Sequence, residues 1–424
     1  MRANFVDRLL ARVDGELATI WITALFTTDA PPSIAALQAG LERLVAETDR
    51  LRLRWDERAA DWAVAERSSD AIAASVRDLP ASSPAELTAR LIRETIDLRH
   101  ALPLRITVAP LTDPVHGRAL VAVQLHHAVG DARSLMHLVR RLWELVAAAP
   151  GPGHPLGPAR LSDRRALLAA GRRLRALPAI VRPEHRVLAR RGLALWRRGD
   201  DLGAPMLLSL RVPMDESVGV AERSALFFGA LLAAVDEHQR DRPWPAPIRL
   251  RVPVDLRRDL GIGPTLENAC SAVPVEISEA AIRATAGDPR ALGRLVPDAL
   301  ARLIGAGVHW STLLECLAVS RFASTASLRS HVRPDLVAPR RASTLVTTYV
   351  GTTDRYFEHV PFPVRTIRTH TPTWGANGLS FGGALVVNMG SFEGLWRRDD
   401  LASFVHSMSH WLSSNHGLAP QVIE

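Results

Sequence analysis

Two adjacent histidines and a nearby aspartate are the side chains of this sequence best suited to proton-transfer chemistry. They lie in VAVQLHHAVGDARS, in which an apolar run ends at His126 and His127 and Asp131 follows shortly afterwards. Imidazole titrates closest to neutral pH among side chains, so either ring could act as a general base. Asp131 could cap a following helix or pair with a buried cation. Histidine pairs also serve purely structural roles, so the surrounding elements must show whether this pair is catalytic or structural.

Side chains alternate along a strand, and the two rings are therefore expected to face opposite ways. His127 would share a face with Val123 and Leu125, and His126 would share one with Gln124. One metal ion is not expected to bind both rings, and no CxxC or HExxH pattern supplies other ligands. The sequence thus predicts no metal site. It places His127 at the end of a strand, where α/β proteins commonly carry catalytic groups.

Hydrophobic spacing predicts a mixed α/β lobe for residues 1–150. Three segments have the composition of strands: 21–28, 103–111 and 118–127. A helix is expected over 33–49 with Ser33 as its N-cap. Leucines and valines between positions 135 and 146 predict an amphipathic helix after Asp131. The histidine pair and the aspartate therefore lie between a strand and a helix.

A stretch rich in proline and glycine, AAPGPGHPLGP at 148–158, interrupts this periodicity. We expect residues 151–204 to form this break and an arginine-rich helical linker. Residues 205–424 are expected to form a second α/β lobe with an apolar helix at 224–237. Its strands are expected over three segments: 248–257, 344–351 and 383–389. The pattern predicts an α/β protein built from two lobes.

All 52 basic residues are arginines, which excludes a Schiff-base lysine and the lysine of a phosphate-binding loop. From Arg160 to Arg198, twelve arginines accompany only two acidic residues, so this stretch carries +10 while the whole chain carries +8. It is either a solvated helical surface or a docking surface for an acidic partner or a phosphate-bearing ligand. No nucleic-acid-binding motif accompanies it, and nucleic acid is not an expected partner.

The two cysteines, Cys270 and Cys316, are too few to build a disulfide framework, so a reducing cytoplasm is the expected location. The N-terminal residues lack the apolar region of a secretory signal. The longest apolar runs, such as SALFFGALLAAV, are shorter than a bilayer-spanning helix requires. We therefore expect no transmembrane segment.

The stretch HHAVGD resembles the HHxxxD(G) motif of the CoA-dependent acyltransferase superfamily, which includes peptide-synthetase condensation domains and is similar in fold to chloramphenicol acetyltransferase. Other stretches are similar to family segments in the expected order: LERLVAETDRLRLRW, DLRHALPLRITV, VPVDLRRDLGIGPTLENACSAVPVEI, TLVTTYVG and LSFGGALVVNMGSFEGLW. The resemblance covers most of the chain except the arginine-rich segment. Ala132 replaces the last glycine of the motif, and Glu267 replaces the family's glycine before Asn268.

The resemblance implies two chloramphenicol-acetyltransferase-like lobes, each a mixed sheet flanked by helices, with the active site in a tunnel between them. It implies that His127 is the catalytic base and that Asp131 pairs with Arg257 of the second lobe. We expect Arg257 to lie on the strand 248–257. His126 and Asn268 match motif positions with structural roles. Three residues are weaker candidates for contacting the substrate: Tyr349, Trp374 and Ser380.

The implied reaction transfers an acyl group from a CoA or carrier-protein thioester to a small alcohol or amine, forming an ester or amide in secondary or lipid metabolism. No tightly bound cofactor is expected, since CoA or phosphopantetheine is a co-substrate. The absence of a GxSxG motif favours direct attack without an acyl-enzyme. The alternative is a non-catalytic condensation-like protein that binds acyl groups or docks a carrier protein. The presence of both His127 and Asp131 favours the enzyme.

Overall fold

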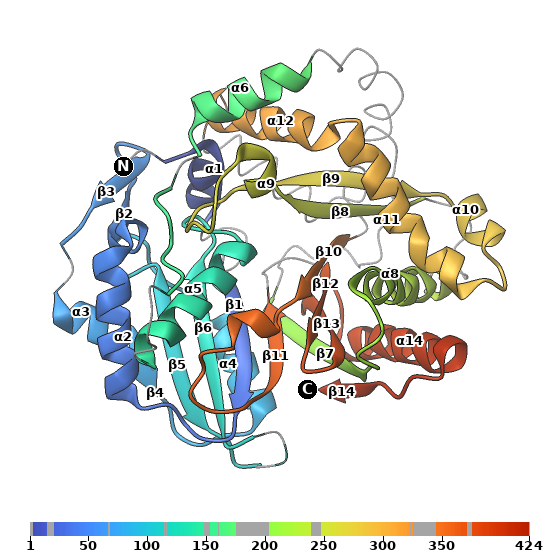
Figure 1. The fold of residues 1–424 in the computed structure, drawn as a ribbon, viewed down its shortest axis with the longest axis horizontal. Helices are drawn as coiled ribbons and strands as arrows, with labels where there is room; N and C mark the ends of the chain where they lie inside the picture. Colours follow the sequence, from blue (N-terminus) through green and yellow to red (C-terminus); the bar gives the residue numbers. More distant parts are fainter. Residues whose placement is uncertain are drawn as a thin grey trace.

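The computed structural model describes most of the 424 residues and arranges them around two large β-sheets (Figure 1). The described residues are 3–14, 21–66, 68–113, 115, 117–147, 153–159, 161–174, 203–238, 247–322, 324, 345–370 and 375–423.

The first sheet has five strands in the order β11-β1-β6-β5-β4. These strands are β1 (Trp21–Thr28), β4 (Val76–Asp78), β5 (Leu104–Pro110), β6 (Ala119–His126) and β11 (Val364–His370). β1 and β6 run antiparallel, whereas β4 is parallel to β5, so the sheet is mixed. The three strands that the sequence predicted for this lobe are confirmed to within two residues.

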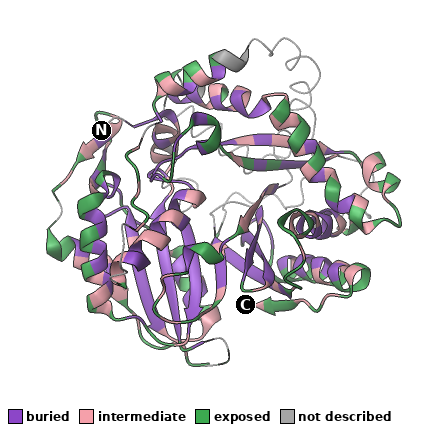
Figure 2. Cartoon of the chain, viewed as in Figure 1, coloured by how far each residue is buried: buried purple, intermediate pink, exposed green. Residues whose placement is uncertain are grey.

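Helices cover both faces of the first sheet. α2 (Ile34–Glu47) and α5 (Ala132–Val146) share a core with one face, and α4 (Pro84–Arg93) shares a separate core with the other. Every residue of β1 and β6 is consequently buried, which explains the nearly continuous apolar run before the histidines. Ser33 caps α2 as predicted, since its side chain accepts a hydrogen bond from the backbone N–H of Ala36. Figure 2 shows these buried strands enclosed by helices with exposed outer faces.

The second sheet has seven strands in the order β14-β7-β13-β12-β10-β8-β9. They are β7 (Pro205–Pro213), β8 (Ile248–Asp255), β9 (Cys270–Ile277), β10 (Leu345–Thr352), β12 (Gly375–Phe381), β13 (Ala384–Phe392) and β14 (Gln421–Ile423). Its largest core is formed with α8 (Val220–Glu237), α11 (Pro289–Gly305) and α14 (Arg398–His416). The apolar helix predicted at 224–237 is therefore present and begins four residues earlier.

The two lobes exchange elements. β11 follows β10 in the chain but pairs with β1 in the first sheet, so this strand departs from the predicted division at residue 205. At the other end of the chain, α1 (Phe5–Val13) packs against α12 (Val308–Phe322) on the second lobe. α12 also contacts α6 (Asp163–Leu174), which begins the arginine-rich linker. The rest of that linker, from residue 175 to 202, lies outside the described residues.

The smaller elements complete the connections. They are η1 (Asp49–Arg52), β2 (Leu53–Asp56), β3 (Asp61–Val64), α3 (Ser69–Ala73), α9 (Arg257–Leu260), α10 (Glu279–Ala284) and η4 (Asp354–Tyr356). One of them corrects a prediction: β8 ends at Asp255, and Arg257 is the first residue of α9 rather than a strand residue. The Asp255 carboxylate accepts a hydrogen bond from the Arg257 backbone N–H at 3.0 Å, which turns the chain out of the strand.

Among the described helices, none is by itself long and apolar enough to cross a membrane. The pair α11 and α12, which are bent by 70° at their junction, passes that test only when the two are taken together.

Candidate active site

The two histidines lie where β6 gives way to a tight turn, and they have different partners. His126 is the last residue of the strand and is fully buried. Its Nδ1 accepts a hydrogen bond from the backbone N–H of Ala128 at 3.2 Å, so the proton of a neutral ring is on Nε2. That nitrogen lies 3.0 Å from the carboxylate of Asp14. His126 therefore holds the turn together and belongs to the packing of the lobe.

His127 lies in the turn, one residue beyond the strand that was expected to contain it, and is only partly buried. Its Nδ1 is 3.2 Å from Oδ1 of Asn268, across the boundary between the lobes. The Asn268 Nδ2 group donates to the backbone carbonyl of His127 at 2.8 Å and to the Asp7 carboxylate at 3.1 Å. The rings of His126 and His127 thus have different partners.

The amide of Asn268 determines which nitrogen of His127 carries the proton. A carbonyl and a carboxylate can only accept hydrogen bonds, so the amide must turn its NH₂ group toward them. Its oxygen then faces Nδ1 of His127, and that contact is a hydrogen bond only if Nδ1 carries the proton. Nε2 is left with a free lone pair. The neutral ring is therefore held in the tautomer that a general base at Nε2 requires.

A buried ion pair lies behind Asn268, and the sequence did not predict it. Asp7 of α1 is fully buried and pairs with Arg50 at 2.7 Å. The Asp7 carboxylate also accepts a hydrogen bond from the indole N–H of Trp62 at 3.2 Å. Arg50 Nε donates to the carbonyl of Val129, two residues after His127, at 3.1 Å. Asp7 and Arg50 therefore fix both the asparagine and the turn that carries the histidine.

Sequence reasoning could have found only part of this network. The spacing of Asn4 and Asp7 is a capping-box pattern, and both capping hydrogen bonds are present at the start of α1. The bond from Asp7 to Asn268, however, joins residues 261 positions apart. No local pattern reports a contact of that kind.

Burial of the imidazole lowers the pKa of His127 below its usual value. The ring's hydrogen bond to its own backbone carbonyl, the charge of Asp131 and the bond to Asn268 oppose this effect without reversing it. At neutral pH the imidazole is therefore neutral, and its Nε2 is able to accept a proton.

Asp131 and Arg257 form a bidentate ion pair between the lobes, as the resemblance implied. The two contacts measure 2.9 and 3.0 Å, and each side chain is 6% exposed. Asp131 also caps α5 by accepting from the backbone N–H of Ser134, and it accepts from the N–H of Ala269. Burial alone would raise the pKa of Asp131, but the adjacent guanidinium and these hydrogen bonds hold it below its usual value. The carboxylate that begins α5 therefore also joins the two lobes.

Both departures from the family motif have a structural explanation. Ala132 is the first residue of α5, and the turn before it has no residue with positive φ that would require glycine. Close packing favours glycine at Gly130 instead, where a Cβ would lie 2.9 Å from the Cβ of Ser134 and 2.9 Å from Leu266 of the second lobe. The Glu267 carboxylate accepts a hydrogen bond from the backbone N–H of Leu161 at 2.7 Å. Its backbone carbonyl accepts one from Arg257.

The weaker candidates for substrate contact lie on the second sheet. The hydroxyl groups of Tyr349 on β10 and Ser380 on β12 are 2.7 Å apart, so the structure brings these two together. Burial raises the pKa of the Tyr349 phenol, which keeps it protonated. Trp374 lies outside the described residues. No hydrogen bond found within the described part of the chain joins this pair to His127, and their contact with substrate remains a prediction.

The surroundings of His127 offer no activated thiol within the described residues. Cys270 opens β9 next to Asn268 and Ala269, and both it and Cys316 are free. Burial strongly raises the pKa of the Cys270 thiol, so it is not a thiolate at neutral pH.

Two surface hollows occur away from His127. One, of about 450 Å³, is lined by residues between Asp354 and Phe381, and the other, of about 350 Å³, lies between α4, β7 and α14. His127 lines neither of them, and the tunnel expected between the lobes remains a prediction.

The two lobes exchange elements, and each is a mixed sheet flanked by helices. This arrangement is a chloramphenicol-acetyltransferase-like fold, and comparison with solved structures supports the fold. The TRI3 trichothecene 15-O-acetyltransferase from Fusarium sporotrichioides aligns over 97% of this chain and 94% of its own, with 13% identity and a TM-score of 0.68. The first condensation domain of the CDA synthetase aligns over 97% and 96%, with 16% identity and a TM-score of 0.61. The epimerization domain from the third module of tyrocidine synthetase B aligns over 96% and 92%, with 14% identity and a TM-score of 0.57.

No protein-family model and no curated protein sequence matches the chain. The structural likeness therefore establishes the fold, and a shared fold does not by itself specify the reaction.

Replacing Asp131 by alanine is expected to destabilise the protein by about 3–5 kcal/mol, because the buried Arg257 would lose its bidentate partner and keep only the partly exposed Asp255 as a counter-charge. Chemical denaturation of the purified variant measures this loss. The Arg93–Glu393 pair is the matched control, since its side chains are 51% and 53% exposed. Arg93→Ala should cost no more than about 1 kcal/mol. Equal effects of the two substitutions would contradict a buried clamp between the lobes.

Replacing Asn268 by alanine is expected to release His127 from its fixed tautomer, since the oxygen that faces Nδ1 is removed. ¹⁵N NMR of labelled imidazoles should show Nδ1 protonated in the wild-type protein and a mixture of tautomers in the variant. The ring of His126 should be unchanged and serves as the internal reference. An unaltered His127 spectrum would show that Asn268 does not set the tautomer.

Proposed function

We propose that this protein is an acyltransferase that joins the acyl group of a thioester to a small alcohol or amine. The observation that carries the proposal is the contact of 3.2 Å between Nδ1 of His127 and the Asn268 side-chain oxygen, from which we infer a neutral ring with its proton on Nδ1 and with Nε2 as the proton acceptor. The fold shared with an acetyltransferase and a condensation domain supports it. Because an epimerization domain shares that fold too, the choice of reaction rests on the residues around His127.

In the proposed reaction His127 moves one proton and forms no covalent bond. Nε2 takes the proton of the acceptor's hydroxyl or amino group as its oxygen or nitrogen attacks the thioester carbonyl. The tetrahedral intermediate then breaks its carbon–sulfur bond, and the imidazolium returns the proton to the departing sulfur. The products are an ester or amide and a free thiol. A positioned acid–base group of this kind contributes about 10²–10⁴-fold to the rate.

The other groups act through position rather than by contact with substrate. The Asp131–Arg257 pair fixes the start of α5 and hence the turn that carries His127. Asn268, supported by Asp7, orients the ring itself. The high pKa of the Cys270 thiol supports direct transfer without an acyl-enzyme. These roles are those expected of a catalytic member of the fold rather than of a non-catalytic acyl-binding or docking relative.

The donor is proposed to be a thioester of CoA or of a carrier protein. The arginine-rich stretch Arg160–Arg198 could steer an acidic carrier, but most of it lies outside the described residues. At its start, Arg164 is exposed, whereas Arg165 is partly buried and donates to the carbonyl of Leu260 at 2.7 Å. Arg165 therefore has a packing role in α6, and a test of docking should begin with Arg164.

The proposal is tested by incubating the protein with acyl-CoA and acyl-carrier-protein donors and a panel of alcohols and amines. Release of free thiol and the mass of the acylated acceptor report turnover. Donor binding without any acylated product across the panel would support the non-catalytic alternative instead.

Replacing His127 by alanine is expected to lower turnover by at least about 10²-fold, because the attacking group loses its base. The control is His100→Ala, which removes an exposed histidine that pairs with Asp97 on the surface. Circular dichroism should show both variants folded. Near-wild-type turnover by the folded His127 variant would refute the catalytic assignment.

The pH dependence of kcat/KM is expected to report the lowered pKa of His127. The reaction needs the neutral ring, so the rate falls as pH drops through that pKa. The midpoint of this acid limb should lie below the ordinary histidine value of about 6.5, with a plateau at neutral pH. Rates measured from about pH 4 to pH 8 test this, with folding checked at each pH. A midpoint above neutrality would contradict a base whose pKa is lowered by its surroundings.

A further inference from the structure

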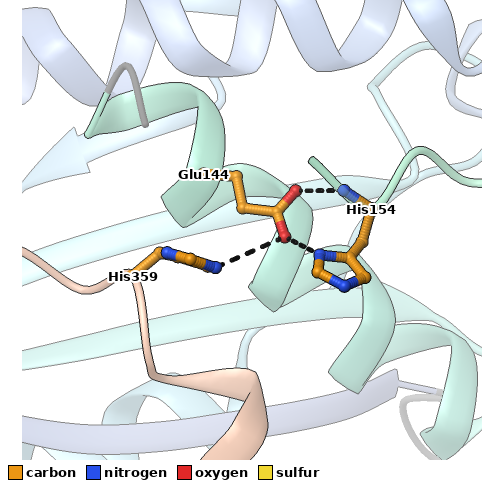
Figure 3. A group of neighbouring side chains, drawn as sticks. All are labelled: Glu144, His154 and His359. Carbon is orange, nitrogen blue, oxygen red and sulfur yellow. Dashed lines mark hydrogen bonds and ion pairs between the residues drawn. The ribbon is translucent and has the colours of Figure 1, made fainter. Parts of the chain in front are cut away.

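A second group of titratable side chains meets at the far end of α5, away from His127. Glu144 lies in the last turn of α5, and His154 lies in the described segment after the proline- and glycine-rich break. His359 lies in the loop between η4 and β11. One ligand atom from each of these residues lies within 4.8 Å of the other two. Figure 3 shows the carboxylate between the two imidazole rings.

The two oxygens of Glu144 have different surroundings. Oε2 accepts hydrogen bonds from the backbone N–H of His154 at 2.6 Å and from Arg141 at 3.1 Å. Oε1 faces Nδ1 of His154 at 2.5 Å and Nε2 of His359 at 3.9 Å. The side chain is only 2% exposed. The protein thus holds the carboxylate by one oxygen and directs the other toward both imidazoles, an arrangement that resembles a supported metal ligand.

Charged side chains around this group pair with one another. Arg141 binds Glu47 through two contacts of 2.6 and 2.8 Å. Arg140 lies 3.4 Å from both Glu144 and Glu358. Three carboxylates therefore surround two guanidinium groups.

We propose that Glu144, His154 and His359 bind a zinc ion, with water in the fourth position. Two imidazole nitrogens and one carboxylate oxygen suit zinc, whereas calcium and magnesium prefer oxygen ligands alone. Zinc ligands at 2.0–2.2 Å in a tetrahedron lie about 3.3 Å from one another. The present separations of 2.5 and 3.9 Å from Oε1 lie on either side of that value. Movements of less than about 1 Å would therefore complete the site.

A zinc ion at this position would have a structural role. The chain leaves the first lobe through the segment that contains His154, and it returns to β11 through the loop that contains His359. A bound ion would fasten both connections to α5, whose opposite end is capped by Asp131. It would thereby brace the helix that follows the His127 turn. The proposal is independent of the acyltransfer reaction.

Zinc titration of tag-free protein, freed of metal by a chelator, tests the site. Calorimetry should show one equivalent bound, and cobalt in place of zinc should give the absorption of a tetrahedral ion. His154→Asn and His359→Asn should each weaken zinc binding by at least about 100-fold, since losing a group that only supports a ligand already costs 10–100-fold. The matched control is His100→Asn, because His100 contacts Asp97 at 2.6 Å on the surface and is not part of the proposed site.

The His359→Asn variant allows the loss of zinc binding to be measured apart from any loss of folding stability. Its nearest carboxylate contact is 3.9 Å, so without metal the variant should unfold at the temperature of the wild-type protein. Zinc should raise the unfolding temperature of the wild-type protein and of His100→Asn, but not that of His359→Asn. Failure of the wild-type protein to bind one equivalent would overturn the proposal, as would unchanged binding by His359→Asn.

Discussion

The buried ion pair between Asp131 and Arg257 is the contact on which the arrangement of the two lobes depends. Removing two charges from water is costly, and their attraction offsets that cost only when the geometry is good and further hydrogen bonds support the pair. Asp131 receives two bonds from Arg257 and one each from the backbone of Ser134 and Ala269. Arg257 also donates to Glu267 of its own lobe. An ion pair held by hydrogen bonds from both lobes in this way favours one position of α5 against the second lobe.

The same short loop of the second lobe serves both the ion pair and the imidazole. Glu267 offers its carbonyl to Arg257, Asn268 holds the ring of His127, and Ala269 donates to Asp131. Consecutive residues thus couple the position of the lobes to the orientation of the proposed base. Asp7 adds a third support from α1, which itself packs against α12 of the second lobe. Rigid positioning of one nitrogen therefore depends on segments from the beginning, middle and later part of the chain.

Exchange of elements between the lobes has a related physical effect. β11 completes the first sheet although it follows β10 of the second, so the chain passes between the two sheets on both sides of this strand. Polar side chains close the junction, since Thr369 of β11 bonds to Asn377 of β12 and Asn388 of β13. The two connecting segments that contain His154 and His359 contact Glu144 at the end of α5 opposite Asp131. α5 is therefore anchored to its surroundings at both ends.

Local periodicity in the sequence determined the strands and helices that flank the histidine motif, including β1, β6, α2 and α5, because burial imposes a pattern on each element. The pairing of Asp131 with Arg257 followed from family resemblance and not from spacing. Only the tertiary structure decided that Arg257 starts a helix, that β11 joins the first sheet, and that Asp7, Asn268 and His127 meet. The physical reason is that a sequence pattern shows which face of an element is buried, but not which distant segment buries it.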